Sequence, residues 1–189
     1  LYVRTRDRLA AAIDVRLSRT FVMVGDFAGS ALALESFETP AEPAALVAEL
    51  AARVRRLLAE HAPAGQCEGV GLVVSGMVDQ RTGRVVYSPQ LGWRDVDLRG
   101  PLAEALGLPV QIENAPLACA QAQMWLGQRG GDVPRDFAYV TVGDGVGVGV
   151  VVDGQVVRGH GYTAGEYGHV PLDPNGPRCL CGATGCVET

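Results

Sequence analysis

The sequence predicts an α/β fold with a mixed sheet, and three observations support this. Apolar runs with strand character open the chain, segments with helical and strand periodicity alternate after them, and glycines and prolines mark the boundaries. Of the 189 residues, 48% are hydrophobic and 20% are charged. A chain of this length and composition buries a sizeable core, as one large domain or two small ones.

The first three elements are predicted to be strands of an antiparallel meander, because β-rich runs follow one another with only short turns between them. These runs are Ala10–Val15, Thr20–Gly25 and Ser30–Phe37. Beyond Pro43, apolar residues recur at helical spacing from Ala45 to Leu58, with arginines among the polar positions. An amphipathic helix is therefore expected there.

Shorter segments continue the alternation. Strands are predicted at Gly69–Ser75, Arg84–Tyr87, Val110–Glu113, Phe137–Val142 and Val146–Asp153, with a hairpin signal at Asp153-Gly154. Helices are predicted at Leu98–Leu106 and at Leu117–Leu126, where Pro116 fits the first turn. Because the opening meander is antiparallel while later strands alternate with helices, the sheet is expected to be mixed.

The charged residues exclude several chemistries. All 16 basic residues are arginines, which removes a Walker lysine, a Schiff base and a lysine general base. The formal net charge of -5 argues against a nucleic-acid-binding surface in this segment, because phosphate affinity comes from clustered positive charge. No uncharged apolar stretch reaches the roughly 18 residues of a membrane span, and the start lacks a signal-peptide core. A soluble, cytoplasmic protein without membrane contact is expected.

The cysteine count is odd, and three of the five cysteines crowd together near the end. With His169, the residues Cys179, Cys181 and Cys186 form a complete Cys3His set for tetrahedral zinc. A loop so rich in glycine and proline cannot hold its shape through a hydrophobic core, and four protein ligands leave no open coordination position. A structural zinc ion is therefore predicted, the alternative being reduced cysteines in a loose tail.

The remaining cysteines and His160 lack partners at ligand spacing. Cys67 and Cys119 are predicted to be buried, unreactive thiols rather than nucleophiles. His160 is interpreted as a solvent-facing loop histidine.

One motif closely resembles the signature of the ROK family, which takes in sugar kinases and sugar-responsive transcriptional repressors. It runs from Gly165-Glu166-Tyr167-Gly168-His169 to Cys179-Leu-Cys181-Gly-Ala-Thr-Gly185-Cys186-Val-Glu188. The resemblance extends to Ser75–Asp79, Pro89–Trp93, Leu106–Val110, Glu113-Asn114 and Gly143–Gly149.

The resemblance implies the bilobal actin-like ATPase fold, which is ribonuclease-H-like, with a mixed sheet flanked by helices. Residues 10–115 would form the first lobe and residues 116–189 the start of the second, with residues 1–9 as the connection from an N-terminal DNA-binding module. The last 20 residues carry no periodicity and the chain stops directly after the cysteine cluster, so the second lobe is expected to be incomplete.

The resemblance also implies a sugar site. Asn114, Glu166, His169 and Glu188 match the positions where the family binds sugar hydroxyls, and Gly76 would approach the ring through its backbone. Carboxylates and amides suit this task because they accept and donate hydrogen bonds in fixed directions. One ring nitrogen of His169 would bind zinc while the other faces the sugar. The alternative interpretation makes Glu166 and Glu188 solvated loop carboxylates.

The requirements of a sugar kinase are poorly met. The first phosphate loop of the family's kinases corresponds here to residues Asp14–Arg19, where side chains replace glycines and no lysine is present. The catalytic aspartate of a Glu-Asn-Asp triplet corresponds to Ala115, which cannot accept a proton. The second loop keeps Gly143, Gly145 and Gly147, although a tight turn between strands explains these glycines equally well. ATP is therefore not expected to be a cofactor.

These observations favour the sugar-sensing effector domain of a repressor, with catalysis lost. A sugar held between two lobes would set the distance between DNA-reading helices in a homodimer or higher homo-oligomer, through an N-terminal helix-turn-helix that contacts operator DNA. One alternative is an active kinase of the glucokinase or N-acetylhexosamine kinase type, with Glu113 or Asp144 as a substitute base. Another is a sugar-binding protein with neither DNA contact nor catalysis. Gln90 stands where many relatives carry asparagine, so the sugar's identity stays open.

Overall fold

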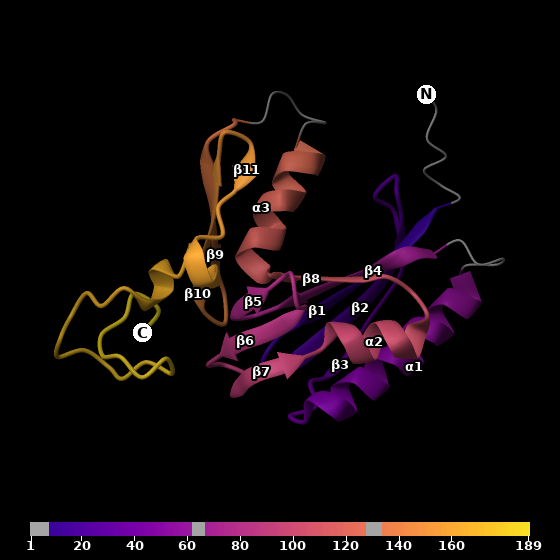
Figure 1. The fold of residues 1–189 in the computed structure, drawn as a ribbon, viewed down its shortest axis with the longest axis horizontal. Coiled ribbons are helices and arrows are strands. Elements are labelled where there is room, and N and C mark those ends of the chain that lie inside the picture. Colours follow the sequence, from indigo (N-terminus) through magenta and orange to yellow (C-terminus); the bar gives the residue numbers. More distant parts are fainter. Residues whose placement is uncertain (1–7, 62–66, 128–133) are drawn as a thin grey trace. The chain divides into compact units, whose positions relative to one another are not determined.

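The computed structural model describes residues 8–61, 67–127 and 134–189 (Figure 1). The chain divides into two compact units, Leu1–Glu113 and Asn114–Thr189. The assignment of residues 10–115 and 116–189 to two lobes stays a prediction. Most of the connection predicted at residues 1–9 lies outside the described residues.

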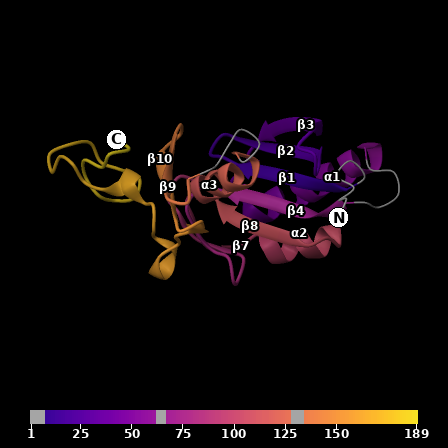
Figure 2. The ribbon, with the colours of Figure 1, turned by 90° about the horizontal axis from the view of Figure 1, so that it is seen from above.

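Five strands of the described part of the first unit form a mixed sheet in the order β3-β2-β1-β4-β8, which Figure 2 shows from above. Their bounds are β1 Leu9–Val15, β2 Arg19–Asp26, β3 Ala31–Glu38, β4 Cys67–Val74 and β8 Val110–Asn114. The first three strands pair antiparallel, and β4 pairs parallel to β1. The predicted meander and the mixed character of the sheet are thus confirmed.

The core of this unit lies between the sheet and two helices, α1 (Pro43–His61) and α2 (Arg99–Leu106). Side chains of β1 alternate between buried and half-buried positions, as expected for a strand with one covered face. On α1, Leu46, Leu50 and Val54 recur at helical spacing and are fully buried. The amphipathic helix predicted at residues 45–58 therefore exists and extends by a few residues at both ends.

A second sheet of the first unit was only partly predicted. It contains β5 (Met77–Asp79), β6 (Arg84–Ser88) and β7 (Trp93–Asp97), paired antiparallel in that order. Only β6 was expected, because three to five residues are too few to show strand periodicity. The buried Trp93 anchors β7, and its Nε1 donates a hydrogen bond to the carbonyl oxygen of Ala41 at 3.2 Å.

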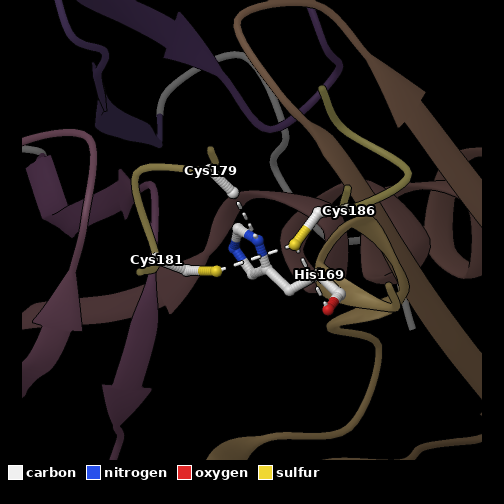
Figure 3. A group of neighbouring side chains, drawn as sticks. All are labelled: His169, Cys179, Cys181 and Cys186. Carbon is white, nitrogen blue, oxygen red and sulfur yellow. Dashed lines mark hydrogen bonds between the residues drawn. The ribbon is translucent and has the colours of Figure 1, made fainter. Parts of the chain in front are cut away.

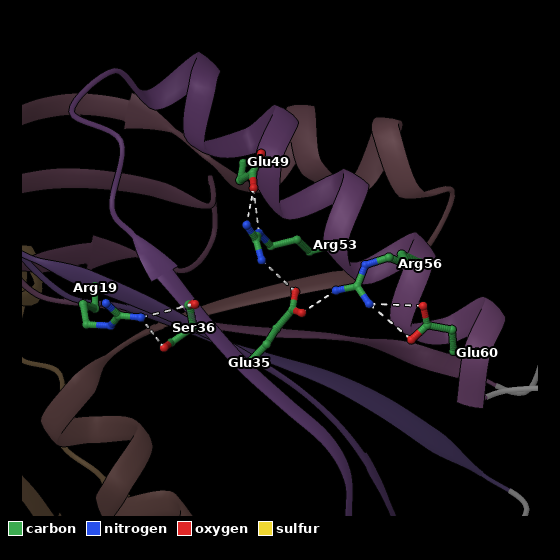
Figure 4. A network of polar contacts seen from close by, with 7 residues as sticks. All are labelled: Arg19, Glu35, Ser36, Glu49, Arg53, Arg56 and Glu60. Carbon is green, nitrogen blue, oxygen red and sulfur yellow. Dashed lines mark hydrogen bonds and ion pairs between the residues drawn. The ribbon is translucent and has the colours of Figure 1, made fainter.

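Charged residues join β3 to α1 on the surface (Figure 4). Glu35 of β3 accepts hydrogen bonds from Arg53 at 3.1 Å and from Arg56. The same two arginines pair with Glu49 and Glu60 one turn away on the helix. Burial raises the pKa of Glu35, but the hydrogen bonds from Arg56 and Arg53 outweigh it and hold that pKa below its ordinary value.

The second unit contains α3 (Ala115–Leu126), which packs on a three-stranded antiparallel sheet. The sheet order is β11-β10-β9, with β9 at Phe137–Val142, β10 at Val146–Val152 and β11 at Gln155–Val156. The hairpin predicted at Asp153-Gly154 joins β10 to β11. Short 3-10 helices follow at His160–Tyr162 and Tyr167–His169.

Within residues 8–61, 67–127 and 134–189, no helix is long and apolar enough to cross a membrane.

Candidate metal centre and neighbouring polar site

The C-terminal loop is held by local backbone pairing rather than by extended strands or helices. Isolated bridges join Pro171 to Cys186 and Arg178 to Thr184. The amide of Cys179 donates to the carbonyl of Ala183 at 2.9 Å, and a tight turn closes at Gly182, whose amide donates to Cys179 at 3.0 Å. These contacts return the chain on itself so that cysteines distant in the loop face one another.

The loop brings His169, Cys179, Cys181 and Cys186 together, with their ligand atoms all within 4.8 Å of one another (Figure 3). Cys181 Sγ and Cys186 Sγ lie 3.8 Å apart, and Cys179 Sγ lies 3.6 Å from His169 Nδ1. Zinc–sulfur bonds of about 2.3 Å and zinc–nitrogen bonds of about 2.0 Å in a tetrahedron require separations of about 3.8 Å and 3.6 Å. The four residues thus fit a Cys3His zinc site through Nδ1 of His169.

The thiols of the metal-free cluster differ in acidity. Burial and the neighbouring thiols Cys181 and Cys179 raise the pKa of Cys186 to about 12. A hydrogen bond with the backbone of Ala183 lowers the pKa of Cys181. A zinc ion would stabilise all of these thiols in the deprotonated form, because it binds several thiolates at once and displaces their protons.

Two carboxylates lie beside the cluster. Glu166 Oε2 is 3.7 Å from Nε2 of His169, whereas Cys179 Sγ lies beside the other ring nitrogen, Nδ1. Glu188 Oε1 lies 3.9 Å from Cys179 Sγ. Burial raises the pKa of Glu166, His169 lowers it and Glu188 raises it, with a raised value as the net result. The structure therefore brings together three of the predicted sugar-binding residues, all in the second unit.

The other two predicted sugar-binding residues, Asn114 and Gly76, also have structural roles. Asn114 is the N-cap of α3, and its Oδ1 accepts a hydrogen bond from the amide of Leu117 at 3.4 Å. Gly76 belongs to the first unit, in the turn between β4 and β5, with φ of +108°. A Cβ at Gly76 would lie 2.8 Å from Cα of Ser88, so the turn itself requires glycine.

The arginines of the segment that resembles the family's first phosphate loop are engaged by neighbouring residues. Arg16 Nε donates to Asp14 Oδ2 at 2.7 Å, and its guanidinium lies over the ring of Phe21. Arg19 donates to Ser36 Oγ at 2.7 Å (Figure 4). Both arginines thus have partners within the first unit.

The glycine run of the second unit serves packing and turn formation. The amide of Gly143 donates to the carbonyl of Gly145 at 3.0 Å, which closes the β9–β10 turn. A Cβ at Gly147 would overlap Pro116 Cγ, and one at Gly149 would lie 2.9 Å from Cβ of Ala120. These glycines allow α3 to approach β10 closely, a requirement that sequence reasoning had not identified.

Two residues next to Asn114 were weighed for catalysis in the sequence. Ala115, which the resemblance places at the catalytic base of the family's kinases, is the first residue of α3. Glu113, which was considered as a substitute base, is buried and accepts a hydrogen bond from the side-chain amide of Gln80. Asp144, the other substitute considered, is exposed in the β9–β10 turn.

The expectation that Cys67 and Cys119 are buried was wrong, since both are half-buried. Cys67 lies at the start of β4, where the end of the sheet leaves it partly open, and its thiol donates to the carbonyl of Gly69 at 3.4 Å. His160 is exposed in its 3-10 helix, in line with its interpretation as a loop histidine.

The mixed sheet of the first unit, in the order β3-β2-β1-β4-β8, is that of an α/β protein of the actin-like ATPase class. Comparison with known proteins identifies the family. The model of the ROK family matches residues 10–189, and this chain belongs to the ROK family.

Relatives within the family have more than one role. The chain is 37% identical over 136 residues to a glucokinase of Halalkalibacterium halodurans, covering 71% of this chain and 41% of that protein. It is 36% identical over 120 residues to the xylose repressor of Bacillus subtilis, covering 64% of this chain and 30% of that protein. The chain thus spans less than half the length of these two curated relatives.

The similar solved structures likewise include both a kinase and a transcriptional regulator. A ROK family glucokinase from Streptomyces griseus, in complex with glucose and AMPPNP, superimposes with a TM-score of 0.81 at 28% identity, covering 95% of this chain and 56% of that chain. A ROK family transcriptional regulator, described as a homologue of the E. coli MLC protein, superimposes with a TM-score of 0.83 at 23% identity, covering 99% and 47%. The second likeness concerns the fold alone.

Proposed function

We propose that this chain is the sugar-sensing effector domain of a ROK-family transcriptional repressor, with a structural zinc ion and without kinase activity. The observation that carries the proposal is Ala115 at the position of the catalytic base, since general-base assistance is typically worth about 10² to 10⁴ in rate. The Asp14–Arg16 ion pair adds to it, because it occupies the segment where related kinases present bare backbone to phosphate.

Zinc would stabilise the folded C-terminal loop and would not take part in a reaction. His169, Cys179, Cys181 and Cys186 would hold it and leave no open coordination position for substrate. The metal would fix the His169 ring through Nδ1, which leaves Nε2 beside Glu166.

The sugar would be bound by Glu166, His169 and Glu188, with Asn114 and the backbone of Gly76 completing the site. The three clustered residues offer carboxylate acceptors and one imidazole nitrogen within a small region. Glucose, xylose and N-acetylated hexosamines are the ligands to test first.

The experiment that tests the proposal is retention of genomic DNA fragments by the intact gene product, with and without a panel of sugars. Fragments retained specifically and released by one sugar support a repressor, whose DNA contact would come from an N-terminal helix-turn-helix and whose dimer would span two half-sites. Absence of specific retention under every condition contradicts it.

Kinase activity is the second candidate, and the similarity to glucokinases favours it. It requires a base other than residue 115. Sugar-dependent ADP formation measures it, with Ala115→Asp as the comparison that restores the related kinases' residue. We expect no sugar-dependent ADP formation by the intact gene product, and a rate comparable with that of authentic glucokinases would contradict the proposed loss of catalysis.

A further inference from the structure

Glu188 connects the metal cluster to the start of β10. Its Oε2 accepts a hydrogen bond from the amide of Val146 at 3.0 Å, although the two residues are 42 positions apart. Its other oxygen, Oε1, lies 3.9 Å from Cys179 Sγ. One carboxylate therefore contacts both a metal-ligating side chain and the residue that follows the Gly143–Gly145 turn.

The backbone of Glu188 is fixed by neighbours of two metal ligands. Its amide donates to the carbonyl of Gly168 at 2.9 Å, and Gly168 directly precedes His169. Glu188 also lies two residues after Cys186, whose carbonyl accepts from the amide of Thr189 at 3.0 Å. Ordering His169 and Cys186 around a metal therefore also fixes the position from which the Glu188 side chain reaches Val146.

Residues 165–168, which directly precede His169, also lie along β10 at two points. The amide of Val148 donates to the carbonyl of Gly165 at 3.2 Å. A Cβ at Gly168 would overlap the carbonyl oxygen of Val146, so backbone meets backbone there. Val146 is thus held at its amide by Glu188 and is packed at its carbonyl against Gly168.

We propose that Glu188 is a positioning residue that transmits the metal-dependent order of the C-terminal loop to the glycine hairpin, residues 143–149. The inference concerns the hairpin rather than the sugar, and it rests on the zinc site of the proposed function. In the metal-bound chain, the carboxylate fixes the amide of Val146, and the β9–β10 turn takes one conformation. When the metal leaves, the anchor of Glu188 loosens and the turn is released.

The test is the rate of amide hydrogen exchange at Val146, which is measured by NMR on the full chain with and without zinc. Glu188→Ala removes the acceptor, whereas Glu188→Gln keeps an oxygen that can accept from Val146. Glu166→Gln is the matched control, because Glu166 lies beside His169 but does not bond to the Val146 amide. The zinc content of each sample is measured separately by atomic absorption.

We expect Val146 to exchange about tenfold faster or more in Glu188→Ala with zinc still bound, because a hydrogen bond to a charged acceptor is among the stronger ones. Glu188→Gln should restore most of the protection, and Glu166→Gln should leave it unchanged. Zinc removal should accelerate exchange in the wild type and add little in Glu188→Ala.

Unchanged exchange at Val146 in zinc-bound Glu188→Ala would overturn the proposal, as would full protection in the zinc-free wild type. Accelerated exchange in Glu188→Gln equal to that in Glu188→Ala would also overturn it, since the acceptor oxygen would then have no role. A wild-type chain that binds no zinc overturns the zinc site as well, and the metal measurement distinguishes that case.

Discussion

The five-stranded sheet of the first unit and the C-terminal loop of the second achieve order by different physical means. In the sheet, Ile13, Val22 and Leu72 are almost completely buried and order comes from the removal of apolar surface from water. In the loop, Leu172 and Leu180 are 72% and 66% exposed, while Cys179 and Cys186 are buried. The side chains that the loop buries are cysteines of the candidate metal centre, whereas the sheet buries aliphatic side chains.

This contrast means that the two regions should respond to different perturbations. The sheet depends on volume and shape in its core, while the loop depends on metal and thiol chemistry. The chain offers a convenient probe, because one of its two tryptophans, Trp93, lies buried in the first unit, and the other, Trp125, is 80% exposed in the second. A Trp125→Phe background leaves Trp93 as the sole tryptophan reporter of the first unit.

The largest expected effect is loss of the loop's order in Cys186→Ser. Removing one of four ligands should reduce bound zinc from about one equivalent to nearly none, because structural zinc binding supplies the folding free energy of such loops. Tryptic cleavage after the exposed Arg178 should accelerate at least about tenfold, while Trp93 fluorescence stays native. Metal analysis and limited proteolysis measure both effects.

Cys67→Ser is the control for that prediction, since Cys67 lies outside the cluster. It should keep zinc and the wild-type cleavage rate. Zinc retained at one equivalent in Cys186→Ser would contradict the assignment of Cys186 as a ligand.

The next largest effect is expected in the sheet core. Leu50→Ala should lower the free energy of unfolding by about 2 to 5 kcal/mol, through lost burial and a residual cavity. Urea titration followed by Trp93 fluorescence measures it, and the folded variant should still bind zinc. Leu34→Ala, at a side chain 66% exposed, should change stability by less than about 0.5 kcal/mol. Equal losses in the two variants would show that the core is misassigned.

A smaller effect is expected where α3 meets β10. Gly149→Ala should destabilise the second unit by about 1 to 3 kcal/mol, because the added methyl would meet Ala120 Cβ at 2.9 Å. Hydrogen exchange in α3 and β10 measures the loss. Gly71→Ala is the matched control in the first unit, since a Cβ there meets nothing within 4 Å. A neutral Gly149→Ala would argue that the strand is free to move away from the helix.

The smallest effect is expected in the surface network around Glu35. Its lowered pKa means that the ionised carboxylate is favoured in the folded state, so its stabilisation is present at neutral pH and is lost as pH falls below about 4. Glu35→Gln should cost at most about 1 kcal/mol at pH 7. Urea titrations at pH 7 and pH 3 measure the difference, which should be smaller at the lower pH. A cost that is unchanged at pH 3 would assign the effect to packing instead of charge.

Much of the fold was predictable from periodicity and much of the metal centre from ligand chemistry. The meander, α1 and the Asp153-Gly154 hairpin each carry a local signal, and so do the four ligands. The short strands β5 and β7 were missed because their order comes from pairing with β6, which is not a local property. The bond between Glu188 and Val146 was also beyond prediction, because it joins residues 42 positions apart through one side-chain rotamer.

The capping role of Asn114 has an evolutionary consequence. Serine, threonine and aspartate all cap a helix nearly as well as asparagine, yet none carries the side-chain amide that the proposed sugar contact uses. A descendant of this chain could therefore exchange Asn114 for one of them, keep α3 intact and lose the proposed contact without any penalty in folding. Selection for stability alone does not preserve a binding function at this position, and its retention through descent would need selection on the ligand itself.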